Sequence, residues 1–357
     1  MLSRKRKIFI FAPIDETGEA NRQLETAGCN LVLGDASWHT PKGNNEDQMC
    51  KLAEGAVALM GTSIRSSPIT RRIMQSAGPD LRVVSKFTVG VDDVDVDAAT
   101  ELGIMVTHAP TESNWGGVAE GTMAMMLALL KKVRERDEAM KAGGWRNPGL
   151  QGTYLGRRLS DDYPGITVGI IGLGRIGRRL ADLLAPWRVR LLACDPYVEP
   201  SRFILHNCQS VDLPTLLKES DVVSLHVTLT KETRRFIGAE QFALMKPAAV
   251  FINTSRGQAV DEAALAAALE QGKIAAASAD VFDDEPLPKD SPLLKLGHKV
   301  LLSPHMVSSN SRSGLYPGLM WATRSVLKIL KGEVPDNVFN TEVIPQWRER
   351  FGGKPAA

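Results

Sequence analysis

The sequence lacks the features that mark several classes of protein. Basic and acidic residues nearly balance, 43 against 41, and a net charge of +2 gives no sign of a nucleic-acid or membrane partner. The longest apolar helical run, Met123 to Leu130, is far too short to span a membrane. The four cysteines, Cys29, Cys50, Cys194 and Cys208, have neither paired nor metal-ligand spacing. We therefore expect reduced cysteines, no metal site and a cytoplasmic location.

The start of the chain also lacks a targeting pattern. The basic residues Arg4 to Lys7 run directly into the apolar stretch Ile8 to Phe11, which is too short for the core of a signal peptide. We expect a solvated tail before a first strand. The 357 residues are enough for two domains with full cores.

A glycine-rich turn, Gly172-Leu-Gly-Arg-Ile-Gly177, is the most informative pattern present. It follows the β-branched run Val168 to Ile171 and opens a helix, and a second apolar run then ends in Asp195. This order, with the acid roughly 20 residues beyond the glycines, predicts a dinucleotide-binding unit in which the helix N-terminus holds the pyrophosphate. The alternative, a glycine-rich loop with an unrelated surface Asp, does not account for the order. The residues expected to contact the cofactor here are Gly172, Gly174, Arg175, Ile176, Gly177 and Asp195.

Asp195 also favours NAD over NADP. Its carboxylate can accept hydrogen bonds from the two ribose hydroxyls but would repel a 2′-phosphate. No Arg follows within residues 196–199 to offset that repulsion.

The pattern of apolar runs predicts two α/β domains. Short strands at Lys7 to Phe11, Val57 to Met60, Arg82 to Ser85 and Met105 to Thr107 precede the glycine turn and alternate with helical stretches. The alternation then resumes after residue 168, and a helix at Trp321 to Leu330 is expected to return to the first domain. The predicted fold is a Rossmann domain, a doubly wound parallel sheet of residues 113–315, inserted into a smaller flavodoxin-like α/β substrate domain of residues 1–112 and 316–357.

One helix, expected from about Val118 to Lys141, is apolar on nearly all sides over its first half. It must be buried, either between layers of its own chain or against a second subunit. Burial within the chain needs no partner and is the default interpretation.

Three polar residues follow predicted strands: Arg256, Glu285 and His305. Ligands of such sheets lie beyond the carboxyl ends of the strands. An Arg can fork onto a carboxylate, a His can exchange the proton of a hydroxyl, and a Glu can orient the His and stabilise its charged form. Singly, each is more commonly a surface ion pair, a turn residue or a strand cap. Together, beside a nucleotide turn, they form a minimal set for oxidising a 2-hydroxy acid.

Six motifs lie in a characteristic order at residues 89–95, 118–122, 172–177, 253–257, 279–282 with 285–286, and 303–305. With these motifs the chain resembles the D-isomer-specific 2-hydroxyacid dehydrogenases, which include D-3-phosphoglycerate, glyoxylate/hydroxypyruvate and D-lactate dehydrogenases. The resemblance implies that Arg256, Glu285 and His305 are the catalytic set, and that this is an NAD-dependent enzyme forming homodimers through the helix from Val118. It further implies that the backbone of Thr88, Val89 and Gly90 holds the substrate carboxylate. The resemblance also places His226, Thr228, Thr254 and Asp280 along the cofactor.

Some positions depart from the family pattern. Thr88 and Arg188 stand where Gly is common, Thr228 replaces a usual Pro, and residues 306–310 differ from the usual small sequence. At Arg188 a left-handed backbone would cost a residue with a side chain about 1 kcal/mol. Arg65 is either a second anion contact for the far end of the substrate or a surface residue. A small 2-hydroxy acid is expected, and its identity is left open.

A protein of another class, an NADH-sensing corepressor on the same fold, would keep all three catalytic residues. Such a protein recruits partners through a long disordered tail or a basic patch, and this sequence has neither.

Overall fold

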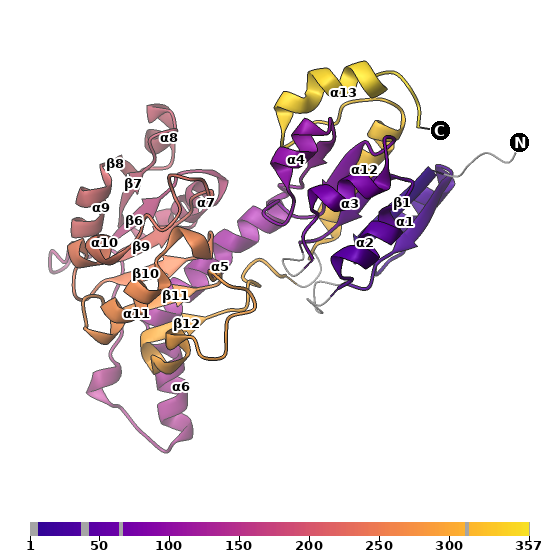
Figure 1. Cartoon of the computed structure of the whole chain (residues 1–357). Helices are drawn as coiled ribbons and strands as arrows, with labels where there is room; N and C mark the ends of the chain where they lie inside the picture. The colour runs from indigo at the N-terminus through magenta and orange to yellow at the C-terminus, as the bar shows by residue number, and fades with distance from the viewer. Residues whose placement is uncertain (1–5, 37–42, 64–66, 311–313, 357) are drawn as a thin grey trace, which may run out of the picture. The chain divides into compact units, whose positions relative to one another are not determined.

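The computed structural model describes residues 6–36, 43–63, 67–310 and 314–356. The chain divides into a terminal unit, residues 1–114 with 310–357, and a central unit, residues 115–309. The α/β fold class is confirmed, with one parallel sheet in each unit (Figure 1). The functional division into a substrate domain and an NAD-binding domain, with the boundaries given above, stays a prediction at this point.

The terminal unit is built on a five-stranded parallel sheet in the order β2-β1-β3-β4-β5, which is the predicted flavodoxin-like order. The central strand β3 is buried at every position, as expected for a parallel sheet covered on both faces. The strands are β1 (Arg6–Ala12), β2 (Cys29–Leu33), β3 (Ala56–Gly61), β4 (Val83–Lys86) and β5 (Met105–Thr107).

Helices cover both faces of this sheet. Side chains of α1 (Glu19–Thr26), α12 (Tyr316–Leu330) and α13 (Ile344–Phe351) form the core of one face. Side chains of α2 (Glu46–Ala53), α3 (Arg71–Ala77) and α4 (Val96–Glu101) form the core of the other. The return of α12 to the first sheet is thereby confirmed, although this helix begins at Tyr316 and not at Trp321.

The central unit contains a seven-stranded sheet in the order β12-β11-β10-β9-β6-β7-β8, with all pairs parallel. From β6 the chain builds outward first through β7 and β8, then on the other side from β9 to β12. This reversal beside β6 is the switch point at which doubly wound sheets bind ligands. The strands are β6 (Thr167–Ile171), β7 (Arg190–Cys194), β8 (Gln209–Ser210), β9 (Val222–Leu225), β10 (Val250–Asn253), β11 (Ala276–Ala279) and β12 (Val300–Leu302).

Helices again pack on both faces. One core joins the sheet to α9 (Leu213–Glu219), α10 (Ala239–Leu244) and α11 (Glu262–Glu270). The other joins it to α7 (Arg175–Leu184), α8 (Pro200–Leu205) and the second half of α5 (Glu112–Leu130). The predicted range of α11 is confirmed. The helix starts there because the Asp261 carboxylate caps it by accepting the Ala264 N–H at 3.0 Å.

The single helix predicted from Val118 to Lys141 is wrong. The structure has two helices, α5 (Glu112–Leu130) and α6 (Val133–Lys141), separated by Lys132 with a left-handed φ of 51°. The side chains of Lys131 and Lys132 donate to the carbonyls of Thr153 and Gly149, so each cation holds a later part of the chain against the break. Arg188 also has a left-handed φ, 54°, as expected.

In the part of the chain that the structure describes, no helix combines the length and apolar character needed to cross a membrane. The same residues include no cluster of His, Cys, Asp or Glu placed to hold a metal ion.

Candidate functional site

The three glycines of the central turn differ in what the protein requires of them. Gly172 has φ 91°, and a Cβ there would lie 2.4 Å from the carbonyl oxygen of His226. A Cβ on Gly177 would lie 2.2 Å from the carbonyl oxygen of Gly172, so this glycine lets α7 pack on the strand. A Cβ on Gly174 would meet no protein atom within 4 Å. The open space at Gly174 is thus the part of the turn that fits the close approach of a dinucleotide pyrophosphate.

The first turn of α7 is arranged to bind an anion. Its N-cap is Gly174, so no side chain caps the helix and its first N–H groups face outward. These donors, with the open backbone at Gly174, fit a phosphate group.

Asp195 lies just after β7, beside the glycine turn. One carboxylate oxygen accepts the N–H of Leu173 at 2.8 Å and the other accepts the N–H of Tyr197 at 2.9 Å. These two bonds fix the carboxylate while leaving lone pairs for the hydroxyls of a ribose.

His226 follows β9 and is a neutral, buried imidazole. Burial lowers the pKa of His226 to about 3. Its Nε2 lies 2.8 Å from the Ser224 hydroxyl, and its Nδ1 is buried with no hydrogen-bond partner among the described residues. A neutral ring beside the turn adds no positive charge to the site.

The two threonines predicted at the cofactor lie in different settings. Thr254 is buried, and its hydroxyl lies 2.8 Å from the hydroxyl of Thr122 on α5, which in turn donates to the Val118 carbonyl. Thr228 is exposed, and its carbonyl accepts the Thr233 hydroxyl at 2.7 Å. Thr122 is a contact that the sequence did not indicate, since a threonine within an apolar helix carries no signal of its partner.

Arg256 follows β10 in a tightly held turn. The Asn253 side chain accepts the N–H and the hydroxyl of Ser255 and donates to the Arg256 carbonyl, at 2.9 to 3.0 Å. Gly257 is required by packing, because a Cβ there would lie 1.9 Å from the carbonyl carbon of Phe282. The Arg256 guanidinium donates to the Ser255 carbonyl at 2.7 Å.

Glu285 and His305 form a direct pair, although they come from different loops. The Nδ1 of His305 lies 2.8 Å from one carboxylate oxygen of Glu285, whose other oxygen accepts the Phe282 N–H at 3.0 Å. The Glu285 side chain is 14% exposed and that of His305 is 38% exposed. A fixed, sheltered carboxylate therefore orients an accessible imidazole.

The backbone of His305 is left-handed, with φ 54°, and Asp280 holds the loop that carries it. The buried Asp280 carboxylate accepts the N–H groups of Met306 at 2.9 Å and Val307 at 3.1 Å. Burial raises the pKa of Asp280, and these bonds, together with the Ser303 hydroxyl, oppose that rise. The sequence did not indicate this structural role, and the role of Asp280 at the cofactor stays a prediction.

Arg256, Glu285 and His305 follow β10, β11 and β12, which are consecutive neighbours in one parallel sheet. Gly172, Asp195 and His226 follow β6, β7 and β9 of the same sheet. Because carboxyl ends of parallel strands share one edge, the structure places the predicted cofactor turn and the predicted catalytic residues along that edge.

The predicted carboxylate loop, Thr88 to Gly90, belongs to the terminal unit. The Thr88 hydroxyl lies 2.9 Å from that of Ser63 and donates to the Gly90 carbonyl at 3.1 Å. The Nδ1 of His108 lies 3.0 Å from the Val89 carbonyl, which can only accept, so Nδ1 carries the proton. In a trans peptide the N–H points opposite to the C=O, so this bond also orients the Gly90 N–H. Arg65 lies outside the described residues.

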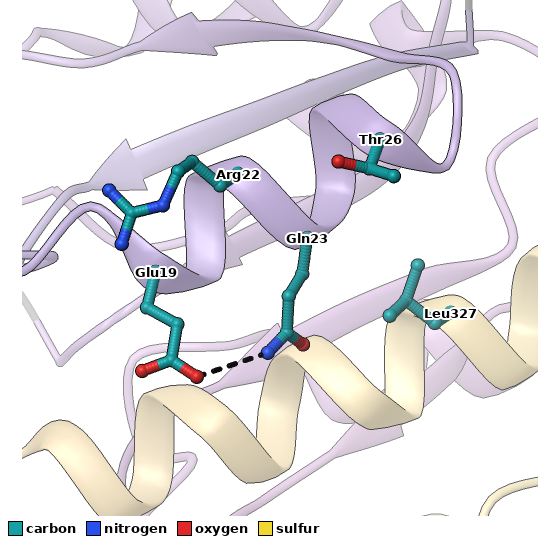
Figure 2. A pocket seen from close by; sticks show the side chains of 5 residues that line it. All are labelled: Glu19, Arg22, Gln23, Thr26 and Leu327. Carbon is teal, nitrogen blue, oxygen red and sulfur yellow. Dashed lines mark hydrogen bonds between the residues drawn. The ribbon is translucent and has the colours of Figure 1, made fainter.

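An open pocket in the terminal unit involves none of these residues. It lies between α1 and α12, and Glu19 on its wall accepts a hydrogen bond from Gln23 (Figure 2). The side chains lining it are Glu19, Arg22, Gln23, Thr26 and Leu327.

Comparison with known proteins identifies the family. The model of the NAD binding domain of D-isomer specific 2-hydroxyacid dehydrogenases matches residues 123–307. A D-3-phosphoglycerate dehydrogenase of Methanocaldococcus jannaschii is 39% identical over 97% of this chain and 61% of its own length. A glyoxylate reductase of Thermofilum pendens is 39% identical over 76% of this chain and 78% of its own length.

A solved structure extends the likeness to the fold. The crystal structure of D-lactate dehydrogenase from Aquifex aeolicus, complexed with NAD and lactic acid, matches with a TM-score of 0.78 at 27% identity. The match covers 94% of this chain and 99% of that one. The chain therefore belongs to the D-isomer specific 2-hydroxyacid dehydrogenase family, and the predicted NAD-binding Rossmann fold is confirmed, while the predicted domain bounds stay a prediction. It spans 61% of the length of the archaeal phosphoglycerate dehydrogenase.

Proposed function

We propose that this protein is an NAD-dependent dehydrogenase that interconverts a D-2-hydroxy acid and its 2-oxo acid. The observation that carries the proposal is the 2.8 Å contact between Glu285 and His305. These two residues follow β11 and β12, and Arg256 follows the neighbouring strand β10. The pair lies on the same sheet edge as the glycine turn. When bound, NAD supplies the hydride acceptor for oxidation and NADH the donor for reduction.

In this proposal His305 is the acid and base. Glu285 engages Nδ1, so Nε2 is the ring nitrogen that takes the hydroxyl proton in oxidation and returns it in reduction. Glu285 favours the protonated ring that forms during oxidation. Arg256 forks onto the substrate carboxylate and a neighbouring oxygen, which aligns the reacting carbon.

The terminal unit is proposed to act as the substrate domain. The backbone of Thr88, Val89 and Gly90 binds the substrate carboxylate through N–H groups. Arg65 is a candidate contact for a distal anion, and Arg65→Ala then weakens only substrates that carry one. The relatives named above, a phosphoglycerate dehydrogenase and a glyoxylate reductase, support a small acid as the substrate.

We also propose a homodimer that works in the cytoplasm. The family resemblance assigns the dimer contact to the helix from Val118, which in the structure is α5. Four cysteines without a disulfide are consistent with a reducing compartment. The corepressor alternative is not favoured, since the relatives named here carry enzyme names.

The test of the reaction is loss of NADH absorbance with a panel of 2-oxo acids: glyoxylate, hydroxypyruvate, 3-phosphohydroxypyruvate, pyruvate and phenylpyruvate. Turnover of any member supports the dehydrogenase. No turnover of any member, with NADH bound, would instead support a sensor.

Cofactor choice is tested at Asp195. We expect at least about a tenfold preference for NADH over NADPH in kcat/KM, because placing a 2′-phosphate against the carboxylate costs more than roughly 1.4 kcal/mol. Asp195→Ser removes the charge and should reduce the preference. Equal use of both cofactors by the wild type would contradict the role of Asp195.

A further inference from the structure

Lys86 is a buried cation that the proposed reaction does not use. It ends β4, and its side chain is 0% exposed. The Nζ donates to the Thr62 carbonyl at 2.8 Å and to the Asp93 carboxylate at 2.6 Å, and it lies 5.1 Å from the centroid of the Phe11 ring. Burial lowers the pKa of Lys86, and the charge of Asp93 opposes this.

Such a pair is a poor source of stability. Removing two charges from water costs about as much as their attraction returns, and apolar residues of similar volume often stabilise a protein equally well. A buried pair does fix geometry, because any other arrangement leaves a charge uncompensated. Its place in the fold therefore indicates what it fixes.

The two partners of Lys86 lie in different segments: Thr62 follows β3, and Asp93 follows the Thr88–Gly90 loop. Thr62 follows β3 and precedes Ser63, whose hydroxyl meets that of Thr88 at 2.9 Å. Asp93 follows the loop, and its own carbonyl accepts the Ile69 N–H at 2.8 Å. Lys86 thus links Asp93, beyond the C-terminal end of the loop, to the Thr62–Ser63 segment. That segment contacts Thr88 at the start of the loop.

The Thr88–Gly90 loop itself has backbone donors available. Among the described residues, the N–H groups of Val89 and Gly90 have no backbone or side-chain acceptor, and both residues are only partly buried. Their directions depend on the attachments of the loop, since no ladder or helix holds them.

We propose that the Lys86–Asp93 ion pair positions the Thr88–Gly90 backbone for the carboxylate of the 2-oxo acid. This inference rests on the proposed function. Lys86 and Asp93 are positioning residues, because their side chains, 0% and 2% exposed, are too buried to touch substrate. Loss of the pair lets the loop take several conformations, so the oxo acid binds more weakly while NADH binding at the glycine turn is unchanged.

The variant Lys86→Met keeps the volume and removes the charge. We expect about a tenfold or larger rise in KM for the oxo acid, with KM for NADH unchanged and kcat within about threefold of wild type. The matched control is Arg82→Met. Arg82 is also a buried cation, but it precedes β4 and donates to the carbonyls of Ile329 and Lys354, away from the loop.

Hydrogen exchange gives a readout that needs no turnover. The hydrogen-bonded amides that flank the loop, those of Phe87, Ile69 and Val94, should exchange faster in Lys86→Met than in wild type, whereas Arg82→Met should leave them protected. Should Lys86→Met not fold, Asp93→Asn takes its place. Its amide oxygen can still accept from Lys86, which favours folding, but the ion pair is lost, so the same directions are expected.

The outcomes separate the two claims. A wild type that turns over no 2-oxo acid refutes the proposed function. If the wild type does turn over an oxo acid, the positioning role is refuted by the same oxo-acid KM and the same exchange at Phe87, Ile69 and Val94 in Lys86→Met as in Arg82→Met. A parallel rise in the KM of NADH and oxo acid also refutes it, since that reports general destabilisation.

Discussion

Glu285 is exposed far less than His305, so its carboxylate meets little competition from water for the bond to Nδ1. A nearby negative charge favours the protonated ring. Glu285→Gln keeps a hydrogen-bond acceptor in the same place and removes the charge. This substitution therefore distinguishes the effect of the Glu285 charge on His305 from its effect on the orientation of the ring.

For Glu285→Gln we expect kcat for oxidation to fall, because the amide keeps the ring oriented but no longer stabilises the charge that the ring gains with the hydroxyl proton. The measurement is the initial rate of hydroxy-acid oxidation with saturating NAD. An unchanged rate would mean that Glu285 is a turn residue without influence on His305.

Residue types did not reveal every contact at this scale. Arg256, Glu285 and His305 were predicted because each follows an apolar strand, and the Glu285–His305 bond agrees with the prediction. Lys86 was not singled out, because lysine is almost never fully buried and one position in a strand carries no sign of a partner. The hydrogen bonds of Asp280 to the His305 loop depend on three-dimensional proximity in the same way.

At the scale of elements, prediction worked where a local chemical cause sets the boundary. Asp261 caps α11 and Gly272, with φ 66°, follows its end, so that helix was placed correctly. The break between α5 and α6 has no such cause, because Lys132 adopts a left-handed backbone without being Gly or Asn. The strand β2, a partly buried strand at the edge of its sheet, was not predicted although Asn30 is its only polar residue.

The turn from β6 to α7 contains one glycine, Gly174, with space for a Cβ and another, Gly177, without it, and this difference allows a test. Gly174→Ala should leave folding intact, because its Cβ meets no protein atom within 4 Å and its φ of −71° suits alanine. It should weaken NADH binding by about tenfold or more, because the methyl group occupies the space proposed for the pyrophosphate. Fluorescence titration with NADH and thermal unfolding measure the two effects.

Gly177→Ala is the matched control. Its Cβ would lie 2.2 Å from the Gly172 carbonyl oxygen, so this variant should lose stability by about 1 to 3 kcal/mol. If Gly174→Ala binds NADH as wild type does, the pyrophosphate does not approach that backbone. If it unfolds as readily as Gly177→Ala, the space at Gly174 is needed by the protein itself.

At the scale of the whole molecule, two α/β domains, one of them with a parallel, doubly wound sheet, were predicted from the alternation of strands and helices and from one glycine turn. Parallel strands need both faces covered, so short apolar runs alternating with helices leave few other arrangements. The relative placement of polar groups on the sheet edge then follows from strand order. The substrate does not follow, because the fold is shared by relatives named for different acids.

Buried neutral histidine should make folding of the whole chain sensitive to acid. The pKa of His226 is about 3 in the folded state, against about 6.5 for an unperturbed histidine. The unfolded state therefore binds the extra proton first, and the stability held above pH 6.5 is lost progressively as the pH falls towards 3. The slope from this one group approaches about 1.4 kcal/mol per pH unit.

We expect His226→Gln to flatten this dependence, because glutamine stays neutral in both states. The measurement is urea unfolding at pH 7.5, 6.5, 5.5 and 4.5, followed by circular dichroism in the absence of NADH. His298→Gln, which alters a 57% exposed side chain, is the control and should retain the wild-type slope. If His226→Gln lost stability between pH 6.5 and 4.5 as steeply as wild type, protonation of His226 would not limit folding in acid.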